Sequence, residues 1–146
     1  MLDLTKFNRA LIVNSRSSNR KLTGMVMWGA WAVASYLEHD GVADVKYLDE
    51  NNEDDFLAKF NEAVKDRELV GFSVTSMQIK YTLPLIQYVK TNYPQIKVVI
   101  GGIHPILFPV QDYGSLIDEV FVEELPKNYF LYKFLPDKVK EVYRNK

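Results

Sequence analysis

Hydroxyl side chains and a pair of glycines are the residues of this sequence whose types and spacing could hold a ligand. Ser73, Thr75 and Ser76 follow a short apolar run, and their hydroxyls could cap a helix or hydrogen-bond a ligand's phosphate, ribose or ring nitrogen. Gly101 and Gly102 follow the next apolar run, where the missing side chains would let the backbone approach a ligand closely. Taken alone, each segment is explained at least as well by a helix cap or a tight turn.

Histidine is the other residue type here that could act on a ligand or a metal ion. His104 stands between the glycine pair and Pro105, where its ring could ligate a metal, donate a hydrogen bond or pack in the interior. His39 precedes Asp40 and is expected at the exposed end of a helix. Two histidines without usable spacing form no serine–histidine–acid set, so no catalytic residue and no metal ligand is predicted. Whether the chain is an enzyme stays open at this point.

Composition narrows the classes of protein further. The 146 residues are 47% hydrophobic, which is enough for the core of one domain. The chain has no cysteine, so an iron–sulfur cluster or a zinc–thiolate site cannot form within it. With 18 basic and 19 acidic side chains, nothing favours nucleic acid or an anionic membrane as a partner. No apolar run approaches the roughly 20 residues that span a bilayer, and no secretory signal is recognisable, so a cytoplasmic location is expected.

Short apolar runs alternate with helix-like patterns, and this alternation predicts βαβ units with a parallel sheet. Continuous apolar runs are typical of strands buried on both faces, whereas Lys46 interrupts the second run, as in a strand near an edge. Strands are predicted over 9–13, 44–48, 69–74, 96–100 and 117–122. The predicted fold is therefore α/β: a doubly wound parallel sheet of about five strands in a flavodoxin-like or Rossmann-like three-layer sandwich.

An acidic run is expected to open the second helix. Asn51 or Asn52 can cap this helix, and Glu53, Asp54 and Asp55 would then lie near its positive end. That position explains the three acids better than a site for a hard cation does.

The other helices are less regular. The first should cover 24–38, and the third should end near Asn92. Pro84 lies inside the third, so that helix is expected either to kink or to start late, near Thr82. The rest of the chain predicts a loop over 103–114 and helices over 129–135 and 136–143.

The sheet would bring the hydroxyls and the glycines together. Ligands of doubly wound folds bind beyond the carboxyl ends of the strands, where the strand order reverses. Both segments follow a strand and should meet at this edge. The sequence Ser73-Val74-Thr75 followed by Gly101-Gly102 resembles the SxL/T…GG pair of cobalamin-binding domains.

The resemblance extends along most of the chain, over roughly 9–122. It is strongest at VGFS (70–73), QIKY (78–81) and YPQIKVVIGGIHP (93–105), which are similar to the cobalamin-binding domain that precedes the barrel of radical-SAM enzymes. Pro109-Val110-Gln111 stands near the P-E or P-Q of that family, and the helix expected over 24–38 resembles the family's early glycine and L-A-x-x-L helix.

This resemblance implies a function. Cobalamin or a related corrinoid would be the cofactor, and Ser73, Thr75, Gly101 and Gly102 would line a slot for its dimethylbenzimidazole nucleotide tail. Leucine in place of either glycine is expected to block the slot and leave the fold intact.

At the rim of this slot, Ser76, His104 and Pro105 are weaker candidates. The resemblance also implies a radical-SAM catalytic domain as a possible partner. Residues 1–146 would form a single domain with a helical extension over about 126–146, and the chain would be a domain of such an enzyme or a small relative standing alone.

Three departures from the family's motifs bear on this hypothesis. The loop 14–19 lacks the histidine of D-x-H-x-x-G, so no protein imidazole is expected on cobalt from there. The segment 121–124 lacks the glycines of G-E-G-E. Since C-x-x-x-C-x-x-C is absent as well, the radical-SAM cluster would have to belong to another domain.

Two other interpretations remain. A degenerate domain would keep the fold and bind no cofactor, with Leu83, Leu107 and Phe108 as candidates to fill the slot. A flavin domain would hold its phosphate on the serine-rich loop 14–19 at a helix start. A receiver domain is disfavoured, because Asn14 and the hydroxyl residues stand where acids are needed.

Overall fold

A five-stranded sheet organises the protein, which is described here by a computed structural model over residues 3–108 and 115–144. The elements in chain order are the 3-10 helix η1 (Leu4–Lys6), β1 (Arg9–Asn14), α1 (Trp28–His39), β2 (Asp44–Asp49), α2 (Phe56–Val64), β3 (Leu69–Ser73), α3 (Ile79–Asn92), β4 (Lys97–Gly101), α4 (Ile103–Leu107), β5 (Glu119–Val120), the 3-10 helix η2 (Tyr132–Phe134) and α5 (Asp137–Arg144). Across the described residues, no helix combines the length and apolar character needed to span a bilayer.

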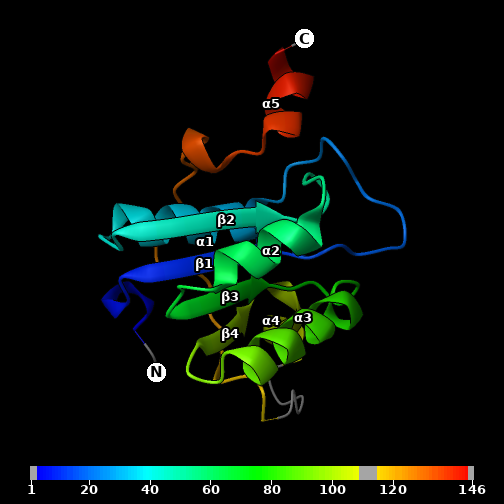
Figure 1. Ribbon diagram of the computed structural model, residues 1–146. Helices are drawn as coiled ribbons and strands as arrows, with labels where there is room; N and C mark the ends of the chain where they lie inside the picture. The colour runs from blue at the N-terminus through cyan, green and yellow to red at the C-terminus, as the bar shows by residue number, and fades with distance from the viewer. Residues whose placement is uncertain (1–2, 109–114, 145–146) are drawn as a thin grey trace.

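The strand order is β2-β1-β3-β4-β5, and every neighbouring pair is parallel (Figure 1). This is the order of flavodoxin-like folds, and it confirms the predicted fold class. The chain leaves β1 toward β2 and then crosses back to β3, so the order reverses at β1 and β3. As the pattern around Lys46 indicated, β2 lies at an edge.

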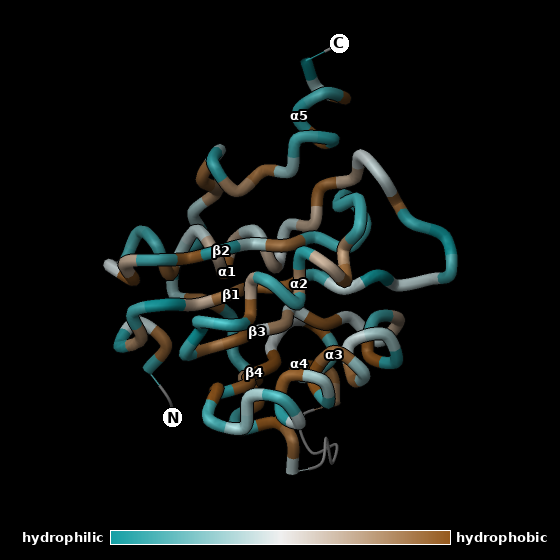
Figure 2. Tube along the Cα trace, in the orientation of Figure 1, coloured by the Kyte–Doolittle hydropathy of each residue, from teal (hydrophilic) through white to brown (hydrophobic). Residues whose placement is uncertain are grey.

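Helices cover both faces of the sheet, which explains why the central strands are apolar along their middle (Figure 2). One core cluster joins α2 and α3 to β1, β3 and β4, with Phe60, Ile86 and Val70 fully or almost fully buried. The other packs α1 and the C-terminal segment on the opposite face, with Ile12 and Leu37 at its centre. Burial on both faces is the arrangement that continuous apolar runs predict.

The first two helices begin later than expected. Gly24 has a φ of 87°, so it lies outside the helix, and α1 starts at Trp28. Asn51 and Asn52 do not cap α2, which starts at Phe56 after all three acids; both asparagines bind the segment before α1 instead. The predicted caps were therefore wrong.

Later elements also differ from expectation. The third helix starts at Ile79 and runs through Pro84, so the late start near Thr82 is wrong. Residues 103–107 form α4 where a loop was expected, and 129–135 form only the short η2 instead of a helix. The strand predicted over 117–122 is limited to Glu119–Val120. The motif-like segment Pro109-Val110-Gln111 lies outside the described residues.

Candidate cofactor site

The hydroxyl of Ser73 lies between two glycines at the carboxyl edge of the sheet. Ser73 ends β3 and is paired with Gly101 in β4. A Cβ built on Gly29 would lie 2.7 Å from the Ser73 Oγ, and one built on Gly102 would lie 3.0 Å from it. The first turn of α1, the tip of β3 and the turn after β4 therefore meet at this hydroxyl, and any side chain at either glycine would occupy the space.

Gly29 is a site residue that the sequence did not reveal. It stands in WGAWAVA, where a glycine among small residues could serve any close helix–sheet contact. Only its approach to Ser73 distinguishes it. A glycine in the first turn of a helix that follows the first strand would have been the signal to test.

The space between the tips of β3 and β4 is closed by backbone. The N–H of Val74 donates to the carbonyl of Gly101 at 2.8 Å, and the N–H of His104 donates to the carbonyl of Val74 at 2.9 Å. Gly102 has a φ of 100°, and a Cβ there would lie 2.7 Å from the Val74 nitrogen. An opening at this point would require these segments to separate.

Bulky side chains do not fill the space. The three candidates for that role are largely exposed: Leu83 at 41%, Leu107 at 61% and Phe108 at 49%. The interpretation as a degenerate domain thus loses the side chains that were expected to fill the slot, although the contact of Gly102 with Val74 still leaves the slot closed.

The remaining predicted residues divide between rim and interior. Ser76 Oγ hydrogen-bonds with Nδ1 of the buried His104 at 2.8 Å, and the neighbouring Pro105 is buried too. Thr75 is exposed, and its N–H donates to the Oε1 of Gln78 at 2.8 Å. Gly101 is in ordinary contact, with a built Cβ 3.5 Å from the Cβ of Phe121. The structure therefore brings Ser73 to Gly102 and Ser76 to His104, and it leaves Thr75 at the surface.

A buried polar network joins the tips of β1 and β2 to the start of α3 and was missed by the sequence analysis. Gln78 Nε2 donates to the Oδ1 of Asn14 at 2.7 Å and to the carbonyl of Ser15 at 2.6 Å. Asn14 Nδ2 in turn donates to the Oδ1 of Asp49 at 3.0 Å. Burial raises the pKa of Asp49, although hydrogen bonds from its asparagine neighbours act in the opposite direction. Polar residues directly after apolar runs were the available signal.

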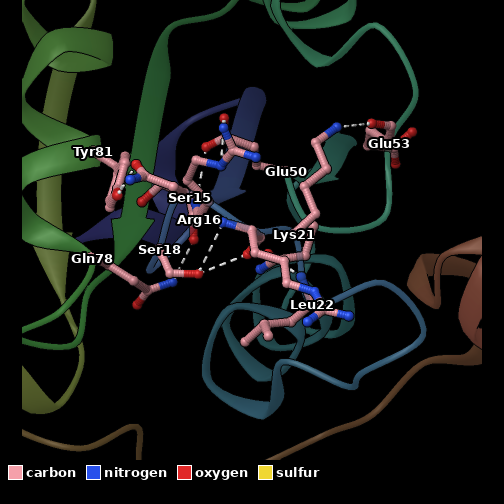
Figure 3. Close-up of polar contacts among 12 residues, drawn as sticks. Ser15, Arg16, Ser18, Lys21, Leu22, Glu50, Glu53, Gln78 and Tyr81 are labelled. Carbon is pink, nitrogen blue, oxygen red and sulfur yellow. Dashed lines mark hydrogen bonds and ion pairs between the residues drawn. The ribbon is translucent and has the colours of Figure 1, made fainter.

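The long β1–α1 loop is attached mainly to residues 50–53, which we call the 50–53 turn (Figure 3). The N–H of Arg16 donates to the Oε1 of Glu50 at 2.9 Å, and Lys21 Nζ donates to the carbonyl of Glu53 at 2.9 Å. On the other side, Tyr81 donates from α3 to Asn19 of the loop at 2.9 Å.

The path of the β1–α1 loop removes the basis of the flavin hypothesis. The serine-rich part of the loop, 14–19, does not lead into a helix start, since α1 begins only at Trp28. Ser15 is buried against Thr82, and Ser18 donates to the carbonyl of Arg20. The loop therefore offers no helix N-terminus to a phosphate.

Exposed apolar side chains occupy the segments that follow β1, β3 and β4. They are Met25, Trp28, Met77, Ile103 and Leu107. Because these strands are parallel, the segments after them lie at the same edge of the sheet as Ser73. A large ligand with an apolar body and a few polar groups suits such a surface.

The strand order defines a doubly wound domain, and the contacts around Ser73 lie at the carboxyl edge, where such domains bind ligands. The family model described as the B12 binding domain matches residues 25–124, which include Gly29, Ser73 and Gly102. The chain therefore belongs to the B12-binding domain family, and cobalamin is the cofactor that this membership indicates. Neither the curated proteins nor the solved structures compared with the chain include a match.

The residues present fit a cobalamin tail in their chemistry. A serine hydroxyl flanked by two glycines offers a polar group beside backbone that carries no side chains, which suits a flat tail once the segments around Ser73 separate. Within the described part of the chain, the Ser73 hydroxyl forms no hydrogen bond, so its donor is available. In this conformation, which we call closed, α1 and the tip of β4 lie directly against Ser73.

Proposed function

We propose that this domain binds cobalamin, or a related corrinoid, at the carboxyl edge of its sheet, with the nucleotide tail held by Ser73, Gly29 and Gly102. The observation that carries the proposal is the position of the Ser73 hydroxyl between the two glycines in a member of the B12-binding domain family. The hydroxyl would hydrogen-bond the polar edge of the tail, and the glycines would leave room for its flat ring.

Other residues of the edge would hold the site together. The hydrogen bond between Ser76 and the buried His104 ties the segment after β3 to α4. Thr75 is exposed beside Ser73 and could contact the ligand at the rim, and Gly101 keeps the strand next to Ser73 free of a side chain. The exposed apolar side chains around the edge would be covered by the corrin ring.

We further propose a radical-SAM catalytic domain as the partner to which the corrin face is presented. The similarity of 70–105 to the cobalamin-binding domain of radical-SAM enzymes supports this partner, and the absence of cysteine means that another domain would hold the cluster. Bound cobalamin would supply methyl transfer or a related reaction there.

A second candidate is an interaction domain that binds no cofactor. The observation that favours it is the direct contact of Gly102 with Val74, which leaves no room between β3 and β4 in the closed conformation. The two candidates differ in whether the segments can separate for a ligand.

The test is retention of hydroxocobalamin by the purified protein after gel filtration, followed by titration. We expect S73A to weaken binding roughly fivefold, which corresponds to one lost hydrogen bond of about 1 kcal/mol. In the S73A background, G29A adds a methyl group whose nearest neighbour is the Cβ of residue 73 at 3.8 Å. This double variant should fold, but the methyl group should block the tail. Its affinity for hydroxocobalamin should be at least tenfold lower than that of S73A, as expected for overpacking of about 1.4 kcal/mol or more.

The matched control is T91A, an exposed change on α3 at the opposite edge, which should bind like the wild type. No retention by the wild type would refute cobalamin binding and favour the interaction domain. Equal affinity of the wild type and the double variant would refute the placement of the tail at Ser73.

A further inference from the structure

The segment that leads into α1 is held by the 50–53 turn and not by the strands of the candidate site. The N–H of Leu22 donates to the Oδ1 of Asn51 at 3.0 Å, and the hydroxyl of Thr23 donates to the carbonyl of Asn51 at 3.1 Å. The N–H of Gly24 donates to the Oδ1 of Asn52 at 2.7 Å. Two backbone N–H groups and one side-chain hydroxyl of three consecutive residues thus donate to one turn that lies after β2.

Asn52 is the most constrained member of this turn. Its side chain is buried, and its Nδ2 donates both to the carbonyl of Met25 at 3.2 Å and to the Oδ2 of Asp49 at 2.8 Å. Asp49 is itself bonded to Asn14 in the buried network. The amide can therefore bind Gly24 and Met25 in one orientation only, because a flipped amide would place its oxygen against the Asp49 carboxylate.

The residues that this amide binds lie just before the first turn of α1. Met25 lies two residues before the N-cap residue Met27, and Gly29 is the second residue of the helix. Trp28 and Gly29 are exposed, and Ala30 is the first buried residue of α1. The contact of Gly29 with Ser73 therefore depends on where the preceding segment is held, in addition to the packing of Ala30.

Resting on the proposed function, we propose that Asn52 is a positioning residue for the cofactor slot, which holds the first turn of α1 against Ser73 and thereby limits uptake of the nucleotide tail. Asn52 touches neither Ser73 nor Gly102 among its hydrogen bonds; it acts through Gly24 and Met25. Release of this amide should let α1 move away from β3 without changing the residues that would bind the ligand.

The first arm of the test uses the protein without cofactor. Hydrogen exchange of the backbone amides of 27–34 should be roughly fivefold to tenfold faster in N52A, since two hydrogen bonds to the segment are lost. T23V removes one exposed hydroxyl from the same contact and should accelerate exchange roughly twofold to fivefold, without disturbing the buried amide. Exchange in α3 should stay unchanged, which separates local opening from general destabilisation.

The second arm measures the association rate of hydroxocobalamin from quenching of the tryptophan fluorescence, since both tryptophans lie in α1. N52A and T23V should associate faster than the wild type by factors similar to those seen in exchange. A residue that only stabilised the fold would give slower or weaker binding when removed. The matched control is N61A, an exposed asparagine of α2, which should change neither measurement.

The outcomes separate the two proposals. The role of Asn52 is overturned if N52A and T23V exchange the amides of 27–34 as slowly as the wild type. It is also overturned if exchange is faster but hydroxocobalamin associates at the wild-type rate. Both conclusions hold even if cobalamin binds. A wild type that binds no cobalamin refutes the proposed function, and the exchange arm then still decides whether Asn52 positions α1. If N52A does not fold, T23V carries both arms.

Discussion

At the scale of single residues, Gly101 and Gly102 are neighbours in the chain with different physical roles. Gly101 is a strand residue, and a Cβ there would meet Phe121 at an ordinary distance. Gly102 has a positive φ, and a Cβ there would lie 2.7 Å from the backbone nitrogen of Val74. The expectation that leucine at either position would leave the fold intact is therefore wrong for Gly102, whose backbone conformation disfavours any side chain.

We expect G102A to lower the free energy of unfolding by about 3 kcal/mol, since backbone strain and a steric contact add up. Gly41 provides the matched control: its φ is 102°, but nothing lies within 4 Å of a Cβ built there. G41A should therefore cost only about 1 kcal/mol, the contribution of the backbone alone. Urea unfolding of the two variants measures the difference, and equal losses would contradict the close approach of Gly102 to Val74.

At the scale of elements, the amino edge of the sheet is held by one buried arginine. The Arg67 side chain is fully buried and donates to the Oδ2 of Asp44 at 2.8 Å, to the backbone carbonyl of Asp44 at 3.2 Å and to the Oδ1 of Asp66 at 3.0 Å. The hydrogen bond from Arg67 lowers the pKa of Asp44 below its ordinary value. Arg67 thus joins the chain before β3 to the start of β2, at the edge opposite the candidate site.

R67M should lower the free energy of unfolding by about 2 to 3 kcal/mol, because backbone and carboxylate acceptors lose a buried donor. K65M is the control: it removes an exposed ion pair with Glu62, which water screens, and should hardly change the free energy of unfolding. Urea unfolding at neutral pH tests this, and similar values for both variants would show that the Arg67 contacts contribute little.

Acid should remove part of the same contribution. Since the pKa of Asp44 is lower in the folded protein than its ordinary 3.8, ionised Asp44 stabilises the fold at neutral pH, and this stabilisation is lost as the pH falls below about 4. In R67M the pKa of Asp44 should return toward 3.8, so the loss of stability between pH 5 and 2 should be smaller than in the wild type or K65M. Unfolding free energies measured across this range provide the check, and parallel profiles would contradict it.

At the scale of the whole molecule, the C-terminal segment lies across α1 and completes the second core. Trp31 Nε1 donates to the carbonyl of Leu131 at 2.8 Å, and the N–H of Leu131 donates to the hydroxyl of Ser35 at 2.9 Å. Phe134 belongs to the same buried cluster as Leu37. Beyond η2 the chain passes the edge strand β2 and ends in α5 (Figure 1), where Lys138 pairs with Asp54.

F134A should lower the free energy of unfolding by about 3 kcal/mol, since Phe134 is only 8% exposed and its removal leaves a cavity against the sheet. Y132A in the same 3-10 helix is the control: Tyr132 is 65% exposed, and its loss should cost less than about 1 kcal/mol. A change of under 1 kcal/mol for F134A would show that the segment does not contribute to the core.

The sequence by itself determined the architecture, because the information needed for it is local. Apolar runs define where strands form, and short crossovers with fixed handedness then make a parallel sheet. The clustering of Ser73 with Gly102 also followed from the strand ends alone. The sequence could likewise indicate the family, since the hydroxyl and glycine segments carry its motif.

Only the tertiary structure decided which residues meet at the site and how it is closed. Gly29 reaches Ser73 because α1 crosses the tip of β3, a contact between segments far apart in the chain. The sequence suggested that Asn52 caps a helix, but its amide oxygen accepts a hydrogen bond from Gly24. The polar groups of a long loop need such partners once the loop packs against the turn after β2. Such long-range contacts leave no periodic pattern in a sequence, and they determine the closed conformation of the slot.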